Sequence, residues 1–477
     1  MKLISIIGVF AIFLFCSCEK LLVEKPKSLA VETFYNTTAE VDVAIGAIYS
    51  PLRAGGTVNF SATYQAILES STDFFLGRAS YAPLNEFQGL DGTGITRVGT
   101  IWNNFYLSIR NANIVIERVP NASALTDAQK SSYIAEARFL RALTYFHLVR
   151  NWGGVILRTE TNMMEQDLPR SSTAEIYKLI TDDLVFAESN LPDKASVPGR
   201  ATKWAAKTAL AEAYLTQGLN QDAADKAKEV MLSGNYSLIP VSDPNDFQKI
   251  FGPEVVTSPE EIFSLKYSLE QQWDFPLYTH GVGTPYVALA GYMAIYSLTN
   301  NTMYSNWDDD DLRKEYNWYP WEFGLGGNTI LNKKFQDPSP QRRNDYPLYR
   351  YADVLLLFAE ASCRAAGQPT SEGVAALNSI HRRAYGYPAL EPSPVDFQIA
   401  DYDEHSFIDL TRREHGYETV AEGKRWLYLK RMDDVKAYIK ATTGKDIADK
   451  HFLWPIPASE FNYNSALDPA ADQNPGY

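Results

Sequence analysis

The chain has 477 residues, of which 45% are hydrophobic, 21% are charged and 13% are aromatic. This length and apolar content allow a large core, and the charged fraction is near the globular average, which argues against bulk disorder. The formal net charge is −14. With this acidic surplus and no basic stripe, nucleic-acid binding is disfavoured.

The first residues predict export. A short positive start precedes the apolar run 4–15, which is too short to span a bilayer comfortably and has the length of a signal-peptide core. The small Ser17 then precedes Cys18, as in bacterial lipoprotein signals. We therefore predict a signal peptide over 1–17 and lipidation of Cys18, followed by a tether over 18–32. An ordinary secretory signal is the alternative.

The first predicted helix follows the tether. Apolar residues there recur at the spacing of one buried helical face, and these residues are Val41, Ala44, Ile45, Ile48 and Leu52. Further along, Thr126 with Gln129 and Ser172 with Glu175 fit the capping box, which satisfies free amides at a helix start.

Three later segments share one pattern, in which a small residue is followed by packing positions three, four and seven residues on. They begin at Ala142, Ala211 and Ala359. Small residues let paired helices approach and a ring fills the neighbouring groove, which is the logic of tetratricopeptide helix pairs. The predicted fold class is therefore mainly α, a tetratricopeptide-like helix-pair array with a loop-rich, aromatic-rich irregular lobe.

Two long stretches lack helical periodicity. Residues 54–100 are rich in Gly, Ser, Thr and aromatics, and residues 233–350 hold many Pro, Asn, Asp and aromatics. Long irregular segments inside a packed domain are usually functional. We expect helical repeats mainly over 38–232 and 350–440, with 54–100 and 233–350 as the ligand-facing segments. A short strand is expected over 262–267.

Motifs for catalysis or metal binding are not found. None of the six His residues lies in an H-E-x-x-H arrangement, and no G-x-S-x-G elbow or P-loop occurs. The acidic run 308–311 could hold Ca²⁺, but a solvated turn is the expected interpretation. Cys363 lies in an apolar helical pattern and is expected to be a core residue. We predict no enzyme activity, no metal and no cofactor.

Several phrases occur along the chain in a fixed order. They include Trp102-Asn103-Asn104-Phe105-Tyr106, Arg350-Tyr351-Ala352-Asp353-Val354-Leu355-Leu356, Glu422-Gly423-Lys424-Arg425-Trp426 and Leu453-Trp454-Pro455-Ile456-Pro457. In this order they resemble the SusD/RagB-like family of outer-membrane nutrient-binding lipoproteins of Bacteroidetes. The chain departs at His415, where the family usually has a basic arginine-like residue, and at Tyr428, where Asp is common.

The resemblance implies a single SusD-like domain over 33–477, lipid-anchored in the outer membrane and exposed at the cell surface. It implies a SusC-like TonB-dependent outer-membrane barrel as partner, over which the protein sits as a lid. It also implies capture of a substrate for import, usually a glycan and in some relatives a peptide. Trp102, Trp204 and Trp426 lie inside structural phrases of the family and are assigned to the core.

A glycan site needs flat rings for the CH faces of sugars and planar polar groups for the hydroxyls. Both irregular segments supply such residues, and the family takes its ligand contacts from these two zones. The candidate ligand-binding residues are Arg78, Tyr81, Asn85, Trp273, Tyr286 and Trp307. For any single ring, packing in the core is the competing role.

The predicted function is thus a surface lipoprotein that captures oligosaccharide and delivers it to the partner transporter. A peptide-binding import lipoprotein and a tetratricopeptide-type protein adaptor are the first alternatives. A surface glycosidase is a further one, because paired carboxylates are not visible in a sequence.

Overall fold

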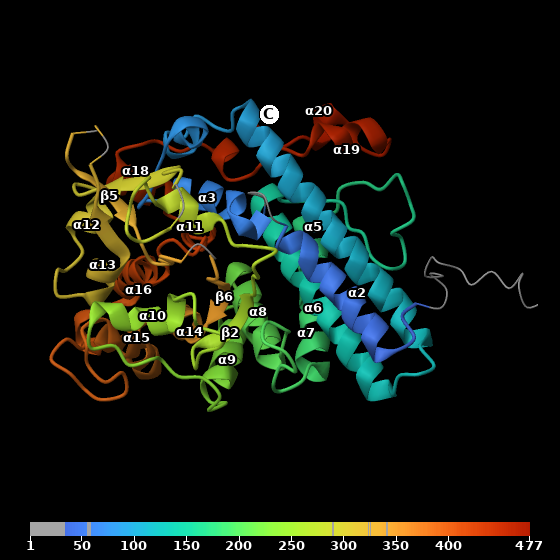
Figure 1. The fold of residues 1–477 in the computed structure, drawn as a ribbon, viewed down its shortest axis with the longest axis horizontal. Coiled ribbons are helices and arrows are strands. Elements are labelled where there is room, and N and C mark those ends of the chain that lie inside the picture. The colour runs from blue at the N-terminus through green and yellow to red at the C-terminus, as the bar shows by residue number, and fades with distance from the viewer. Residues whose placement is uncertain (1–33, 55–58, 289–290, 323, 325, 340–341) are drawn as a thin grey trace, which may run out of the picture.

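Helices make up most of the described chain (Figure 1). The computed structural model describes residues 34–54, 59–288, 291–322, 324, 326–339 and 342–477. The predicted signal peptide, Cys18 and the tether lie outside these residues. Within the described ranges, no helix combines the length and apolar character needed to cross a membrane.

The helices named below have these bounds: α2 Thr38–Leu52, α3 Thr63–Ser70, α4 Ala82–Asn85, α5 Gly92–Arg118, α6 Asp127–Trp152, α7 Thr173–Asn190, α8 Lys203–Thr216, α9 Asn220–Met231, α11 Phe275–Thr279, α13 Leu312–Asn317, α14 Tyr351–Ala366, α15 Ser371–Ala384, α16 Glu404–Thr419, α17 Arg425–Leu429, α18 Val435–Thr443 and α19 Ala458–Tyr463. The strands are β1 Leu76–Gly77, β2 Glu261–Leu265, β3 Ile295–Leu298, β4 Trp318–Pro320, β5 Thr329–Asn332 and β6 Tyr346–Arg350.

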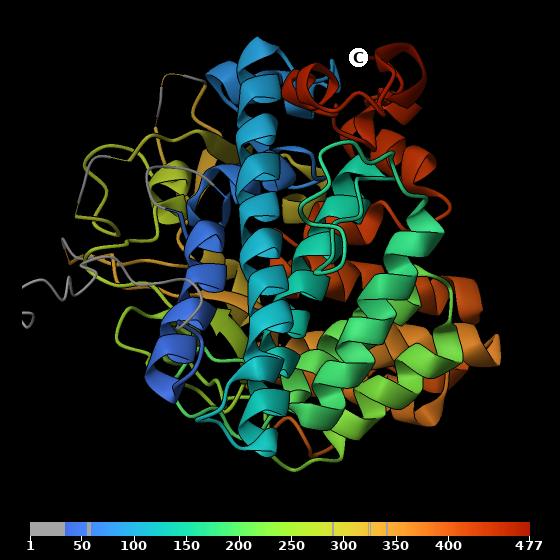
Figure 2. The same cartoon turned by 90° about the vertical axis from the view of Figure 1, so that its right-hand side faces the viewer.

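Successive helices pack side by side as an array. The order of contact runs from α2 through α5, α6, α7 and α8 to α9, and then passes directly to α14 and α15. In Figure 2, α5 runs almost the full height of the molecule beside α2. Because α9 packs on α14, the segment 232–350 is an insertion between two neighbouring helices of the array. The mainly α fold class with a helix-pair array is confirmed.

Local sequence accounts for these helices. The five apolar residues predicted to share a face of α2 are all buried. The side chains of Thr126 and Gln129 cap α6 reciprocally, and those of Ser172 and Glu175 cap α7 in the same way. The strand expected over 262–267 is present as β2, which begins one residue earlier and ends two residues earlier than expected.

Two expectations need correction. Segment 54–100 was expected to be irregular, yet it contains α3 and the start of α5. All eight residues of α3 are buried, so it shows no polar face and no helical periodicity. The start of α5 is rich in Gly and Thr and is instead fixed by the Asp91 cap, whose carboxylate accepts from the Gly94 amide. Trp204 is only partly buried, and its indole donates to Asp193 near the surface.

The insertion supplies most of a four-stranded sheet, in the order β1-β3-β5-β4. All its pairings are antiparallel, with Leu76 opposite Tyr296, Ser297 opposite Ile330 and Tyr319 opposite Leu331. The two irregular segments therefore meet in one sheet. A separate two-stranded sheet joins β2 to β6 beside α8.

The sheet has an inner and an outer face, because side chains alternate along a strand. On the inner face, Ile295, Ser297 and Ile330 are buried, and Trp318 packs on Phe75 with ring centroids 5.3 Å apart. The opposite positions 296, 298, 319, 329 and 331 form the outer face. The candidate site lies on this outer face.

Candidate functional site

Aromatic rings collect on the outer face of the sheet. Met293, Tyr319 and Leu331 form a small buried cluster there, separate from the main core. Three partly buried rings, Tyr286, Tyr296 and Trp321, pack against this cluster. We call these six residues the aromatic face. Its outermost rings are accessible and are held from beneath by buried apolar side chains.

Close packing fixes the rings of the aromatic face. The centroids of Tyr286 and Tyr319 are 4.6 Å apart, and those of Tyr319 and Trp321 are 6.4 Å apart. Trp321 lies against Gly281, where an added Cβ would be 2.5 Å from the indole nitrogen. Only a residue without a Cβ leaves the indole this position. The platform is thus preformed, which lowers the entropic cost of binding.

A buried histidine supports Tyr319 from behind. The His280 Nδ1 lies 3.0 Å from the Tyr319 hydroxyl, and the two rings stack with centroids 5.8 Å apart. Burial lowers the pKa of His280 to about 3, so the imidazole is neutral near neutral pH. His280 therefore positions Tyr319 and carries no charge to the face.

Two charged side chains flank the rings. The Lys333 ammonium lies 5.0 Å from the centroid of the Tyr286 ring. Glu322, which follows Trp321, is exposed. Lys333 continues the outward alternation of Leu331 on β5, whereas Glu322 lies beyond the end of β4. Because β4 and β5 are antiparallel, the two charges lie toward opposite ends of the face.

A second group of tyrosines adjoins the aromatic face through the segment 277–293. Tyr292 is 54% exposed, and its ring contacts Tyr278 at 5.6 Å between centroids. Tyr278 in turn contacts Tyr81 at 6.0 Å. The Arg78 guanidinium donates to the Tyr292 carbonyl at 2.9 Å. These contacts tie the β1 region to the loop that carries Tyr286.

A polar cleft of about 380 Å³ opens at the β1 edge of the sheet. Leu76 and Leu298 line it from the sheet, and Asn85, Asn300 and Lys445 are among its polar lining. Amides and an ammonium are groups that hydrogen-bond hydroxyl-rich ligands. The same sheet thus carries rings on one face and planar polar groups at its β1 edge.

Two family models match the chain. The model described as "Starch-binding associating with outer membrane" matches residues 24–215, and the SusD family model matches residues 268–477. The chain belongs to the SusD/RagB family. A relative, SusD-like protein P25 of Formosa agariphila, is 25% identical over 540 residues and 99% of each chain is covered.

Solved structures of SusD-like proteins have the same fold as this family member. A SusD homolog from Bacteroides thetaiotaomicron superposes with a TM-score of 0.77 at 21% identity, covering 94% of this chain and 98% of the other. Surface glycan-binding protein A from Bacteroides uniformis gives a TM-score of 0.75 at 22% identity, covering 92% and 99%. The likeness extends over the array and the inserted lobe together.

Two of the six candidate ligand residues lie in the core of this SusD-like fold. Trp273 is 0% exposed, and its indole donates to the Phe60 carbonyl at 2.8 Å. Trp307 is 2% exposed and stacks on Tyr417 with centroids 4.1 Å apart. Neither indole has a free face, so the structure corrects their assignment to the site. Aromatic content alone does not distinguish a ring packed in the core from a ring exposed to a ligand.

The other four candidates lie near the sheet in different roles. Tyr81 is buried under the Arg97 guanidinium. Asn85 is buried, but it lines the polar cleft while its amide oxygen accepts from the Gly77 amide at 2.9 Å. Arg78 and Tyr286 are partly exposed. Of the six, only Tyr286 belongs to the aromatic face, and its role as a ligand contact stays a prediction.

Local sequence patterns do not reveal the rest of the aromatic face. Tyr319 and Trp321 alternate around Pro320, but β4 has only three residues, too few to reveal a period of two. Tyr296 lies in a strand of four residues. Their meeting with Tyr286 depends on the order of strands in the sheet, which no local pattern encodes.

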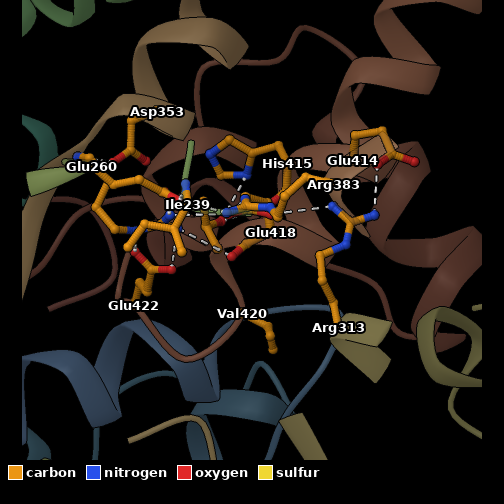
Figure 3. Close-up of polar contacts among 12 residues, drawn as sticks. Ile239, Glu260, Arg313, Asp353, Arg383, Glu414, His415, Glu418, Val420 and Glu422 are labelled. Atoms are coloured by element: carbon orange, nitrogen blue, oxygen red, sulfur yellow. Dashed lines mark hydrogen bonds and ion pairs between the residues drawn. The ribbon is translucent and has the colours of Figure 1, made fainter. Parts of the chain in front are cut away.

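A buried charge network joins Arg350 and Glu422, from two of the family phrases, to acids and arginines of α15 and α16, as Figure 3 shows. Glu414, Glu418 and Glu422 recur every four residues along α16 and the turn after it, so they face one way. Glu418 accepts from Arg383 at 2.6 Å and from Arg350 at 3.0 Å. The neighbouring guanidiniums hold the pKa of Glu418 at about 2 against the opposing effect of burial. All five side chains are buried, so the network is structural and offers no surface to a ligand.

Glu69 of α3 lies beside this network and differs from it. Its Oε1 accepts from the Gly423 amide at 2.6 Å, whereas Oε2 has no hydrogen-bond partner among the described residues. Burial is the main reason that the pKa of Glu69 rises to about 8, and nearby Glu422 and Asp73 raise it further. The carboxyl group is therefore mostly protonated at pH 7.

The two departures from the family pattern contact each other. The rings of His415 and Tyr428 stack with centroids 3.9 Å apart and an interplanar angle of 24°. Burial, with Arg425 and Arg431 nearby, depresses the pKa of His415 well below its usual value, so the pair is neutral. A neutral stack occupies the place of the charged pair that the family pattern implies.

The acidic run 308–311 forms a turn. The Asp311 carboxylate is bound by the Arg313 guanidinium at 2.7 Å, and Asp308 accepts from the Asp310 amide at 3.0 Å. In the described ranges, no cluster of three or more His, Cys, Asp or Glu residues is arranged to hold a metal ion. Cys363 is a buried free thiol, and burial raises its pKa to about 11, which makes it a core residue and a poor nucleophile.

Proposed function

We propose that this protein is a cell-surface lipoprotein that captures oligosaccharide on its aromatic face and passes it, unaltered, to a TonB-dependent outer-membrane barrel. The single observation behind the proposal is the preformed platform: Tyr286, Tyr296 and Trp321 are accessible while a buried cluster holds them from beneath. Sugar rings present flat CH faces that stack on such rings. Family membership and the surface glycan-binding neighbour support a glycan as cargo.

Anchoring completes the proposal. Lipidated at Cys18, the body would be held at the outer membrane by the tether over 18–32, close to its transporter. Fatty-acid labelling of the wild type and of the Cys18→Ala variant in the native host tests this step. Label on the wild type alone is expected, and an unlabelled wild type contradicts it.

Binding is tested by electrophoresis of the purified protein in native gels cast with a panel of glycans. Trp321→Ala and Tyr286→Ala should each weaken retention about thirtyfold, since loss of a central ring costs about 2 kcal/mol. Tyr463→Ala is the control, because Tyr463 is 74% exposed but lies on α19, outside the aromatic face. Wild-type retention in both ring variants rejects the aromatic face as the site. If the purified protein shortens the glycan, the proposal that it binds its cargo without cleaving it is rejected.

A further inference from the structure

The aromatic face carries a cation, Lys333, whose ammonium lies over a ring of the face. Lys333 follows β5 with the same outward parity as Thr329 and Leu331. Its ammonium lies 5.0 Å from the centroid of the Tyr286 ring. Tyr286 packs in turn on Tyr319, at the centre of the platform. Because the ammonium lies over the Tyr286 ring, the acid group of a ligand bound on the aromatic face would meet it beside that ring.

No acidic partner neutralises Lys333. Among the described residues, its ammonium makes no ion pair within 4.0 Å and no hydrogen bond, and the ring contact is its only side-chain interaction. Lys314 provides a comparison, because its ammonium also lies over a tyrosine, Tyr304, at 4.7 Å. Lys314 is paired with Asp309 at 2.5 Å and donates to the Trp307 carbonyl. Of these two lysines, Lys333 is the one whose charge is not paired with an acid among the described residues.

The free cation stands out against the charge of the whole chain. The net charge is −14, so the average field repels anions. Screening limits that field to about 8 Å at physiological ionic strength, and a contact at Tyr286 is governed by the nearest charges. The nearest exposed carboxylate along the chain from Trp321 is Glu322, toward the opposite end of the face. Lys333 thus places a positive charge at Tyr286, and Glu322 places a negative charge beyond Trp321.

We infer that the ligand is an acidic glycan, with a carboxylate or sulfate group bound by Lys333. The sugar carrying the acid would lie against Lys333 and the Tyr286 ring, and the following neutral sugar would lie toward Trp321, so the charges would also set the direction of the chain. This inference rests on the proposed function and adds the chemical class of its ligand.

The test uses the purified mature protein in native gels. The probes are polygalacturonate for carboxylates, carrageenan for sulfate esters, and dextran and laminarin as neutral glycans. The wild type should be retained by at least one acidic probe, which identifies the acid group. Lys333→Met should weaken that retention about tenfold, whereas Lys333→Arg should keep most of it. Lys178→Met, which removes an exposed charge on α7, should behave as wild type.

The outcomes separate the two proposals. Three results overturn the acidic ligand. The protein is retained by the neutral probes alone, it is retained by no probe, or an acidic probe retains the wild type and Lys333→Met equally. The first and third of these results leave the aromatic face intact provided that Trp321→Ala and Tyr286→Ala still lose retention. If those two ring variants bind as wild type, the site itself is wrong. Thermal unfolding of each variant shows that loss of binding is not loss of fold.

Discussion

Glu69 gives the sharpest test of the electrostatics of the core. Its side chain is 0% exposed, and its pKa is raised from 4.5 to about 8. The folded protein therefore holds a proton between these values that the unfolded chain releases. Stability should fall as pH rises from about 4.5 to about 8, because over this window the unfolded state binds fewer protons. Glu69→Gln, which has no proton to lose, should be spared this loss.

The size of the effect follows from the shift. At about 1.4 kcal/mol per pKa unit, a rise from 4.5 to about 8 corresponds to about 5 kcal/mol. This is an upper bound, because an ionised Glu69 would draw Lys334 and water toward it. The amide oxygen of the Gln variant can still accept from the Gly423 amide, so the variant tests charge with little change in shape.

Urea unfolding at pH 5, 6, 7 and 8 measures the effect. The stability of Glu69→Gln minus that of the wild type should rise steadily from pH 5 to pH 8 by several kcal/mol, and all other titrating groups cancel in this difference. Glu372→Gln is the control, because Glu372 is an exposed glutamate paired with Lys228, and its difference should stay nearly flat. A constant difference for Glu69→Gln across the four pH values would refute the reasoning.

Two further predictions concern packing. Gly281→Ala should displace the Trp321 indole and weaken glycan retention about tenfold, with little change in melting temperature. Gly46→Ala is the control and should bind normally, because an added Cβ there meets nothing within 4 Å. Equal binding by both variants contradicts a platform fixed at Gly281. His415→Arg should destabilise the protein by about 3 kcal/mol, because it buries an unpaired cation beside other cations. Adding Tyr428→Asp to His415→Arg should recover much of the lost free energy of unfolding, measured in denaturant. If the double variant is no more stable than the less stable single variant, a charged pair cannot replace the neutral stack.

The sequence foretold the helices better than the site. The apolar residues of α2 recur with helical periodicity because one side of that helix is exposed to solvent. The sequence of α3 lacks this periodicity because every residue of the helix is buried. Trp273 and Trp307 sit in the same loop-rich stretch as Tyr286, and local composition treats the three alike. Tertiary contacts decide which of the three is buried: the Trp273 indole donates to the Phe60 carbonyl, and the Trp307 ring stacks on Tyr417. The family phrases contain Arg350 and Glu422 of the charge network, whereas Glu414, Glu418 and Arg383 lie outside the quoted phrases and join the network only through tertiary contacts.

The sheet joins parts of the chain that are made at different times. The Ser297 hydroxyl donates to the Phe74 carbonyl across 223 positions, and β1 has no neighbour in the sheet other than β3 among the described residues. Helices α5 to α9 can meet their neighbours soon after synthesis, but β1 must wait until the insertion has emerged. High contact order of this kind slows folding and leaves apolar surface open in the interval. The aromatic face should therefore be among the last parts of the molecule to form, and the newly made chain would need protection from aggregation until the sheet is complete.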